Sequence, residues 1–239
     1  MWRHTPLLMT TKRTAWFGFN NIKTLYNGQL KVLDLFSGLE GWSQAFRDRG
    51  HDVLTLDSDP RFDSDICIDI REFSTLQLPW KPDIILASPP CNAFSVASIG
   101  KHWGGGKRAY VPKSEGAKLG IELVKHTKDL IQAIDPYFFV IENPRGLLRK
   151  LGLLDEFERH TVTYCQYGET RMKPTDLWGG FPPSLKLKDP CKNGAPCHEA
   201  APRGARTGSQ GLNKFESAKI PYKLAEAVCI AAEKDRSRT

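Results

Sequence analysis

The sequence predicts an α/β fold in which a mostly parallel sheet carries helices on both faces. Residues 84–87 and 137–141 are apolar along their whole length, which is typical of strands buried on both sides. Apolar residues at helical spacing separate such strand candidates along the chain, as in folds that alternate strands and helices. A tight glycine turn at residues 37–41 joins the first strand candidate to the first helix. These three observations define the expected fold class.

The elements are expected in a regular order along the chain. The strand candidates are residues 31–36, 52–56, 66–70, 84–87 and 137–142. The first helix follows the glycine turn, and Gly50 is placed to end it. The second helix begins at the N-cap candidate Ser114 and runs to residue 134, because Pro136 stops it. The last helix covers residues 222–233.

Length and composition limit the class of protein. A chain of 239 residues is long enough for one well-filled domain with an insertion or tail. It has 34 Lys and Arg against 27 Asp and Glu, and this net charge of +7 favours a polyanionic partner. No apolar run approaches the length of a membrane span, so no membrane association is expected. Six irregularly spaced cysteines fit a reducing cytosol better than a disulfide scaffold.

The glycine turn predicts a cofactor site at the end of the first strand. Its glycines are only Gly38 and Gly41, so the longer pattern that clamps a pyrophosphate is absent. Glu40 would repel a diphosphate, which favours a cofactor with an adenosine and a positive centre, such as S-adenosylmethionine. Asp57 is placed to accept from ribose hydroxyls and Asp69 to hold the adenine amino group. Helix capping or turn formation is the alternative for both acids.

A cysteine follows the strand candidate at residues 84–87. Pro89 and Pro90 cannot continue the hydrogen bonds of a strand, so the chain leaves the sheet there. Cys91 is therefore presented at the carboxyl end of a strand, where open α/β sheets bind their ligands. A cysteine in this position is a candidate nucleophile. The alternative is a small buried side chain in the core.

Three motifs occur together along the chain: DLFSGLEG at residues 34–41, PPCNAFS at 89–95 and ENP at 142–144. Together they resemble the cytosine-C5 DNA methyltransferase family, whose patterns are close to D-L-F-x-G-x-G-G, P-P-C-Q-x-F-S and E-N-V. The resemblance covers about residues 31–180 and, loosely, the last helix. It implies a short, phage-like member with a Rossmann-like S-adenosylmethionine-dependent methyltransferase fold, a seven-stranded and mostly parallel sheet, and a small irregular appendage.

The resemblance implies a reaction and assigns residues to it. Cys91 would attack carbon 6 of a cytosine flipped out of double-stranded DNA, and Glu142 would lie beside ring N3 to neutralise the charge. Carbon 5 would then take a methyl group from S-adenosyl-L-methionine, leaving S-adenosyl-L-homocysteine. A capping or salt-bridged acid is the alternative for Glu142. The residues expected around the cofactor are Phe36, Ser37, Gly38, Gly41, Asp57, Ser58, Asp69, Ile70 and Pro89.

A basic segment at residues 167–175 resembles the family element Y-G-x-P-Q-x-R-x-R. Arg171 stands where the family has Gln, Lys173 matches the first Arg, and Thr175 replaces the second. Arg171 and Lys173 are therefore expected to take part in holding the cytosine and a backbone phosphate. Asn92 likewise replaces a Gln after the cysteine, which keeps an amide on a shorter side chain.

A glycine-rich segment at residues 100–108 corresponds to a mobile loop in the family. Its glycines would act as hinges, and Trp103 would stack on or wedge between bases. Its basic residues would bind phosphates, and they are Lys101, Lys107 and Arg108. An ordinary surface loop is the alternative interpretation.

The chain is expected to divide at residues 1–30, 31–180, 181–216 and 217–239. The first region is a basic extension without the apolar core of a secretory signal, and the second is the catalytic domain. The third is a short irregular target-recognition region, and the fourth is a helix returning to the catalytic domain. Polar residues in the third region suit a phosphate backbone, and they are Arg203, Arg206, Gln210 and Lys214. One copy of the chain is expected to bind DNA. Its sequence specificity is expected to be loose or to be supplied by a partner subunit.

Cys191, Cys197 and His198 lie close together in this third region. Zinc would need a fourth ligand from elsewhere, for which Cys165 and His160 are candidates. Closed structural zinc sites normally show paired short spacings, so free thiols are favoured and no metal is expected.

The sequence thus predicts a DNA (cytosine-5-)-methyltransferase in the cytoplasm of a bacterium or a phage-infected host. Three alternatives stay open: cytosine-5 methylation of RNA such as tRNA, a non-catalytic DNA-binding or regulatory member of the family, and a relative of S-adenosylmethionine as donor. The presence of both Cys91 and Glu142 argues against the regulatory alternative. Restriction, self-protection of a mobile element and regulation are all compatible with the sequence.

Overall fold

The computed structural model describes residues 28–106, 109–200 and 212–237. Several sequence-based expectations fall outside these ranges: nearly all of the N-terminal extension, and the residues Lys107, Arg108, Arg203, Arg206 and Gln210. Within the described ranges, no helix is both long and apolar enough to cross a membrane.

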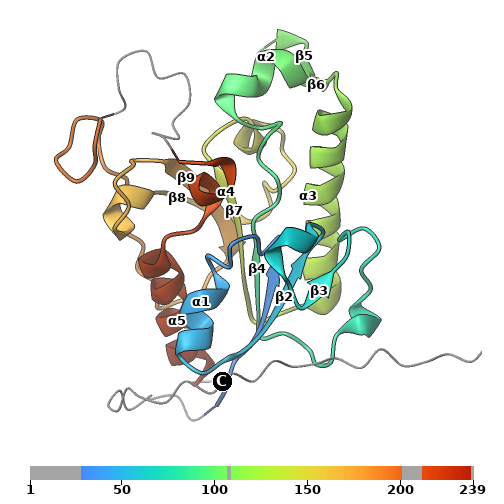
Figure 1. Cartoon of the computed structure of the whole chain (residues 1–239), viewed down its shortest axis with the longest axis vertical. Helices are drawn as coiled ribbons and strands as arrows, with labels where there is room; N and C mark the ends of the chain where they lie inside the picture. The colour runs from blue at the N-terminus through green and yellow to red at the C-terminus, as the bar shows by residue number, and fades with distance from the viewer. Residues whose placement is uncertain (1–27, 107–108, 201–211, 238–239) are drawn as a thin grey trace, which may run out of the picture.

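A seven-stranded sheet runs through the protein in the order β3-β2-β1-β4-β7-β9-β8 (Figure 1). Its strands are β1 (Lys31–Leu35), β2 (Asp52–Asp57), β3 (Ile66–Cys67), β4 (Ile84–Ala87), β7 (Phe138–Pro144), β8 (Glu158–Thr163) and β9 (Pro174–Gly180). Neighbouring strands are parallel from β3 through to β7, whereas β9 is antiparallel to both β7 and β8. The expected Rossmann-like, mostly parallel sheet is confirmed.

Helices and short segments connect the strands. The α-helices are α1 (Ser43–Asp48), α2 (Ile99–His102), α3 (Glu115–Ile134), α4 (Lys214–Ala218) and α5 (Tyr222–Arg236). The described 3-10 helices are η1 (Pro60–Phe62), η2 (Thr75–Gln77), η3 (Val96–Ser98), η5 (Leu148–Lys150) and η6 (Tyr164–Tyr167). A separate antiparallel pair, β5 (Trp103–Gly104) and β6 (Val111–Pro112), lies beside α2 at one end of the molecule (Figure 1).

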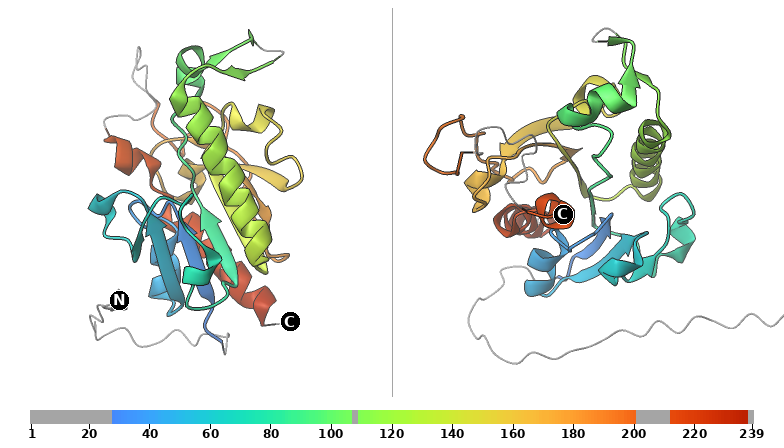
Figure 2. Two further views of the ribbon diagram at one scale, coloured as in Figure 1. Left: turned by 90° about the vertical axis from the view of Figure 1, so that its right-hand side faces the viewer. Right: turned by 45° about the horizontal axis from the view of Figure 1, so that its top comes forward.

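Helices cover both faces of the sheet because alternate strand residues point in opposite directions. On one face, Leu33 and Ile85 belong to the buried core that α3 completes. On the other face, Val32 and Leu86 belong to the core that α1 and α5 complete. Figure 2 shows α3 on one side of the sheet and α1 with α5 on the other. Each such fully buried aliphatic side chain stabilises the fold by about 1.5–3 kcal/mol.

Helix α3 begins and ends where the sequence predicts. Ser114 Oγ accepts a hydrogen bond of 3.1 Å from the Ala117 N–H, which satisfies one of the unpaired donors of the first turn. Asp135 follows the helix in the left-handed conformation, with φ of +50°, and Pro136 cannot extend it. The apolar stripe of α3 faces the sheet, so this helix fixes the wall behind β1 and β4.

The strand order reverses between β1 and β4, since the chain builds out to β2 and β3 on one side and to β7 on the other. Ligands of open α/β sheets bind outside the carboxyl ends of the strands at such a point. Ser37 N–H donates to Leu56 O and Ser88 N–H donates to Leu35 O, at 3.1 Å each. The glycine turn after β1 and the Pro-Pro-Cys segment after β4 therefore both start from fixed positions at this point.

The sheet differs from the expected strands in two places. The strand expected at residues 66–70 is only two residues long, because the chain turns away after β3. Strands β8 and β9 lie beyond the last strand that the sequence predicted. The first half of β8 is exposed and polar, and β9 starts with Pro174 and ends in two glycines, so neither has the pattern of a buried strand.

Candidate active site

A cavity of about 860 Å³ lies at the carboxyl ends of β1, β2, β4 and β7. Its volume is typical of small-molecule and cofactor pockets, which span about 300–1,000 Å³. All residues that the sequence assigned to the cofactor or to catalysis line it: Phe36, Ser37, Gly38, Gly41, Asp57, Ser58, Asp69, Ile70, Pro89, Cys91, Glu142, Arg171 and Lys173. The residues expected to bind the cofactor and those expected to act in catalysis therefore line the same cavity.

An acid from the neighbouring strand shapes the glycine turn. Asp57 Oδ2 accepts a hydrogen bond of 3.0 Å from the Gly38 N–H, and its Oδ1 accepts one of 2.9 Å from the Asp59 N–H. Gly38 has a φ of +50°, which residues with a Cβ rarely adopt. A carboxylate offers about four acceptor positions. Asp57 therefore supports the turn and keeps acceptor capacity for a hydroxyl in the cavity.

Gly41 is required by the close approach of the C-terminal segment. A Cβ at this position would lie 2.5 Å from the backbone nitrogen of Ile220 and 2.9 Å from its Cβ. Ile220 is buried and precedes α5, and both Ile220 and Phe215 line the cavity. The last part of the chain therefore closes over the glycine turn and completes one wall of the site.

Asp69 and Ser37 contribute two further polar groups to the cavity. Asp69 accepts hydrogen bonds from Arg71, at 2.7 Å from its guanidinium and at 2.9 Å from its backbone N–H. These bonds hold the pKa of Asp69 below its usual value, so its carboxylate is an ionised acceptor. Ser37 Oγ is buried, and no group in the described part of the chain accepts from or donates to it. A ligand in the cavity would supply the missing partner of Ser37.

Cys91 lies in a short turn that a second motif holds in place. The Phe94 N–H donates to Cys91 O at 2.9 Å, and Phe94 itself is buried. Asn143 Nδ2 donates to Pro89 O at 2.9 Å and so connects the Glu-Asn-Pro motif to the Pro-Pro-Cys segment. The Cys91 side chain is half-buried and borders the cavity. The bond from Asn143 thus fixes the turn of Cys91 relative to Glu142.

Glu142 is the buried acid of this site, with only 4% of its surface exposed. Tyr164 Oη donates a hydrogen bond of 2.8 Å to Glu142 Oε1, and Lys173 Nζ lies 3.9 Å from the same oxygen. Burial raises the pKa of Glu142 above its usual value, and the charge of Lys173 and the bond from Tyr164 oppose this only in part. The carboxyl group therefore keeps its proton, and with it the ability to donate a hydrogen bond, to a higher pH than an exposed glutamate does.

Lys173 extends toward Glu142 across a neighbouring aromatic ring. Its Nζ lies 4.3 Å from the centroid of the Tyr164 ring, where the ring's electrons attract a cation. Its backbone φ of +26° is rare for a residue with a side chain and carries strain that the surrounding structure must hold. Such strain gathers at functional sites, which agrees with a position in the cavity wall.

Arg171 is already paired within the protein. Its guanidinium is buried and lies 2.7 Å from Glu169 Oε2. This pairing offsets its positive charge, although its side chain still borders the cavity. Of the two predicted basic residues, Lys173 is therefore the one whose charge lies close to Glu142. Arg171 forms part of the cavity wall.

Neither Tyr164 nor Ser88 was predicted from the sequence to take part in the site. Tyr164 lies in η6 and contacts Glu142 across 22 residues of sequence, so no local pattern could reveal the pair. Ser88 hydrogen-bonds to Glu142 and accepts a bond of 3.1 Å from Trp42 Nε1. The only available signal for Ser88 was its position just before the two prolines. Both residues surround the carboxyl group with polar partners.

Trp103 does not occupy the position expected of a DNA wedge. Its side chain is buried, it donates a hydrogen bond of 2.6 Å to Ala93 O, and its ring centroid is 6.1 Å from that of Phe94. In this conformation the indole packs behind the Cys91 turn, so contact of Trp103 with bases stays a prediction. Lys101, by contrast, is exposed at the end of α2.

The fold and the site define the class of protein: an α/β methyltransferase, with a Rossmann-like sheet whose cavity joins a glycine turn, a cysteine and a buried acid. A family model described as C-5 cytosine-specific DNA methylase matches residues 30–157, which is more than half of the chain. The chain belongs to this C-5 cytosine-specific DNA methylase family, and the resemblance seen in its motifs is confirmed.

Two methyltransferase sequences agree with this assignment. The chain is 30% identical over 174 residues to the probable DNA (cytosine-5)-methyltransferase of frog virus 3 (isolate Goorha), covering 69% of this chain and 78% of that protein. It is 30% identical over 186 residues to the type II methyltransferase M.FnuDI of Fusobacterium nucleatum, and spans only 49% of that protein's length. The solved structure of the Entamoeba histolytica methyltransferase EhMeth overlaps with a TM-score of 0.49 at 14% identity, over 69% of this chain and 57% of that one.

Proposed function

We propose that this protein transfers a methyl group from S-adenosyl-L-methionine to carbon 5 of a cytosine in double-stranded DNA. One observation carries the proposal: Cys91 and the buried acid Glu142 border the same cavity as the glycine turn. Membership of the C-5 cytosine-specific DNA methylase family supports the choice of cytosine and DNA. The catalytic unit is proposed to be residues 31–180, with residues 181–216 as a short recognition region and residues 217–239 as a returning helix.

Cys91 is the proposed nucleophile. Carbon 5 of cytosine is too weak a nucleophile to take a methyl group directly. The thiolate of Cys91 forms a bond to carbon 6, and the electrons of the ring's 5,6 double bond move toward carbon 5, which then attacks the methyl group. Loss of hydrogen 5 to solvent and expulsion of the Cys91 thiolate restore the aromatic ring. The fixed turn of Cys91 supports this role, because attack requires a held geometry.

Glu142 is the proposed acid. Addition of a thiolate to carbon 6 places negative charge on the ring, and a hydrogen bond or proton from Glu142 to ring N3 would stabilise it. The raised pKa of Glu142 supports this role, because a protonated carboxyl group donates where a carboxylate only accepts. Lys173, close to the same carboxyl group, would stabilise the charge that remains when the proton is given up.

The residues of the cavity fit the expected cofactor. Asp57 and Asp69 offer carboxylate acceptors for hydroxyl and amino hydrogens, and the unsatisfied Ser37 Oγ offers a polar contact. When bound, S-adenosylmethionine supplies an electrophilic methyl group on a positively charged sulfur, and S-adenosylhomocysteine is the product. The acidic character of Glu40, Asp57 and Asp69 suits a cofactor with a positive centre better than one with a diphosphate.

DNA is the proposed partner, and one copy of the chain is proposed to act on it in the cytoplasm. A cytosine must leave the base stack to reach the cavity, which costs a few kcal/mol. The net charge of +7 favours contact with phosphates, and so does the exposed Lys101 in the last turn of α2. Since the recognition region is short, we infer loose sequence specificity or help from a partner subunit.

The test is methyl transfer from tritiated S-adenosylmethionine to double-stranded DNA or to transfer RNA, each in separate reactions. We expect label in DNA with the wild-type protein and none with Cys91→Ser. Label in RNA alone would replace the DNA proposal with the RNA alternative. Cofactor binding without label in either substrate would instead favour a regulatory member of the family.

A further inference from the structure

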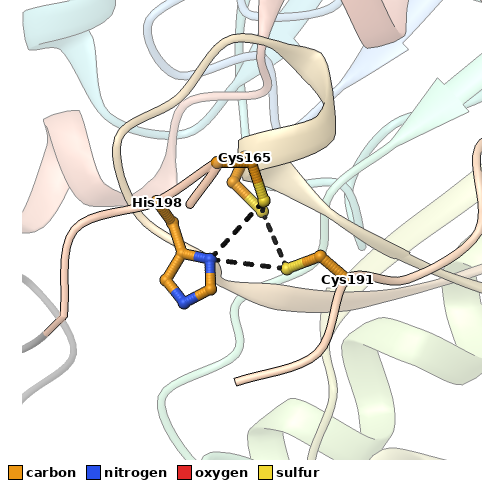
Figure 3. A group of neighbouring side chains, drawn as sticks. Cys165, Cys191 and His198 are labelled. Atoms are coloured by element: carbon orange, nitrogen blue, oxygen red, sulfur yellow. Dashed lines mark hydrogen bonds between the residues drawn. The ribbon is translucent and has the colours of Figure 1, made fainter. Parts of the chain in front are cut away.

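A second cluster of reactive side chains lies outside the lining of the cavity, and one of its members, Cys165, belongs to η6. It consists of Cys165, Cys191, Cys197 and His198, whose Sγ and imidazole nitrogen atoms all lie within 4.8 Å of one another. Figure 3 shows Cys165, Cys191 and His198 pointing toward one another from separate segments of the chain. Neither the family assignment nor the proposed reaction gives this cluster a role.

Three distances in the cluster match those between ligands of one metal ion. Cys197 Sγ lies 3.7 Å from Cys165 Sγ and 3.7 Å from His198 Nδ1, and Cys191 Sγ lies 3.5 Å from the same nitrogen. Tetrahedral zinc, with bonds of about 2.3 Å to sulfur and about 2.0 Å to nitrogen, places sulfurs about 3.8 Å apart and a sulfur and a nitrogen about 3.5 Å apart. These three distances therefore fit a bound zinc ion with almost no movement of the side chains.

The Cys165–Cys191 pair is closer than this, but its two sulfur atoms do not form a disulfide. Cys165 Sγ and Cys191 Sγ are 3.1 Å apart, which exceeds the disulfide bond length of about 2.05 Å by a wide margin. A movement of a few tenths of an ångström would bring this pair to the spacing of two zinc ligands. Thiols are also poor hydrogen-bonding partners for one another, so their convergence needs another explanation.

We propose that Cys165, Cys191, Cys197 and His198 bind one structural zinc ion. Three thiolates and one imidazole form a closed four-coordinate set, which leaves no position for a substrate or water and is typical of structural sites. Zinc binding releases the thiol protons to solvent, and the imidazole coordinates through Nδ1. This proposal replaces the free-thiol interpretation drawn from the sequence, where only three of the four ligands were neighbours.

Polar groups next to the cluster already orient its ligands. Gln166 Nε2 donates to Cys197 Sγ at 3.4 Å, which suits a negatively charged sulfur. The Cys191 N–H donates to Thr163 Oγ1 at 2.9 Å, which fixes the backbone that carries this cysteine. Groups of this kind around the first ligands orient a metal site and tune its affinity.

The zinc ion would connect the segment after β9 to the segment that supports the acid of the active site. Cys165 directly follows Tyr164, which bonds to Glu142. Beyond His198, the Glu199 N–H donates at 2.8 Å to the backbone oxygen of Thr170, which lies in the basic segment at residues 167–175. The ion would therefore hold the start of the proposed recognition region against the basic segment. The recognition region has little apolar core of its own, so a metal ion would stabilise it.

A second group of possible ligands is already engaged. His51, Cys229 and Glu233 lie together in the interior, but both oxygens of Glu233 accept hydrogen bonds from Arg49, at 2.9 and 2.6 Å. A cation there would have to displace the guanidinium. We assign the zinc ion to the cysteine-rich cluster alone.

The test is the metal content of the full-length protein, purified without a polyhistidine tag and measured by elemental mass spectrometry. We expect about one zinc ion per chain in the wild type and in Cys67→Ser, which removes an exposed cysteine outside the cluster. Cys197→Ser and His198→Asn, at exposed and half-buried positions, should lose zinc by about five-fold or more. A wild-type protein without zinc would overturn the proposal, as would unchanged content in both cluster variants.

Cobalt substitution gives a second readout that does not depend on methyl transfer. Titration of zinc-free wild-type protein with Co²⁺ should produce thiolate-to-cobalt charge transfer and the visible bands of tetrahedral cobalt, and Zn²⁺ should abolish both. Absence of these bands, or a Cys165–Cys191 disulfide in the non-reduced wild-type protein, would contradict the proposal. Because neither measurement uses DNA or S-adenosylmethionine, failure of the proposed reaction leaves this result unaffected.

Discussion

Tyr164 Oη donates a 2.8 Å hydrogen bond to Glu142 Oε1 in the interior of the protein. Burial raises the pKa of Tyr164 well above its usual value, so the phenol keeps its proton and remains a donor. The same bond lowers the pKa of Glu142, against the larger effect of burial that raises it. Tyr164 therefore sets how firmly the proposed acid holds its proton.

Tyr164→Phe should move the pH dependence of methyl transfer. Without the phenol, burial raises the pKa of Glu142 further, and the acid stays protonated to a higher pH. We expect the alkaline limb of kcat/KM to shift to higher pH, with a loss of rate of about ten-fold or less at neutral pH. Tyr167→Phe is the matched control, since it removes a buried phenol that accepts from Lys188 N–H instead. Identical pH profiles in both variants would argue against this role of Tyr164.

Glu142→Gln tests the acid directly. The amide keeps the shape of the side chain but cannot give a proton to ring N3, so the rate of transfer should fall by about 10²-fold or more. DNA affinity should change by only a few fold, because the substitution leaves the surface of the protein intact. Single-turnover transfer and DNA binding, measured on the same preparation, separate the two effects. A variant that retained a third of the wild-type rate would exclude Glu142 as the acid.

Gly41→Ala should damage the cofactor site through the C-terminal segment. The added Cβ would collide with the backbone of Ile220, and such overpacking typically costs about 1–3 kcal/mol. We expect a lower midpoint in urea unfolding together with weaker binding of S-adenosylmethionine by calorimetry. Gly100→Ala is the control, because a Cβ there meets no atom within 4 Å. Equal behaviour of the two variants would mean that the segment at Ile220 does not form this wall.

Asp34 predicts a pH dependence of stability. Burial raises its pKa to about 7, although the bond from Ser43 opposes this. The folded protein then keeps a proton that the unfolded chain loses above about pH 4, so this contribution is complete below that pH and declines up to about pH 7. Between pH 5 and pH 8 the free energy of unfolding of the wild type should fall by about 2 kcal/mol more than that of Asp34→Asn.

The check for Asp34 is urea unfolding of both proteins at each pH. The comparison isolates Asp34, since Glu142 and the other titrating groups are present in both. An identical change from pH 5 to pH 8 in the wild type and the variant would show that Asp34 is already ionised in the folded state at pH 5.

Much of the sheet and of the cavity could be predicted because its signals are local. Apolar strands such as β4 and the capped helix α3 carry their pattern in consecutive residues. The glycine turn and the Pro-Pro-Cys segment follow strands directly, so the parallel topology alone brings them together. Strands β8 and β9 lacked such a pattern. The first half of β8 is exposed, and β9 contains the buried acid Asp176, whose charge is paired with that of Arg149.

The parts that could not be predicted depend on contacts between distant segments. Ile220 covers Gly41 and Tyr164 supports Glu142, yet neither partner carries a signal in its own neighbourhood. The cysteine cluster has the same origin, since Cys165 lies 26 residues before Cys191 and reaches it only through the fold. The burial of Trp103 was not predicted, because an indole in a glycine-rich segment gives no sign of being buried.

The central claim is that Cys91 bonds to the pyrimidine ring, and a DNA duplex containing 5-fluorocytosine tests it most directly. Fluorine at carbon 5 cannot be removed as hydrogen is, so the protein should remain attached after methyl transfer. We expect a covalent complex that survives denaturation, whose peptide map places the nucleotide on Cys91, and none with Cys91→Ser. A complex of equal yield with Cys91→Ser, or attachment at another residue, would contradict the account.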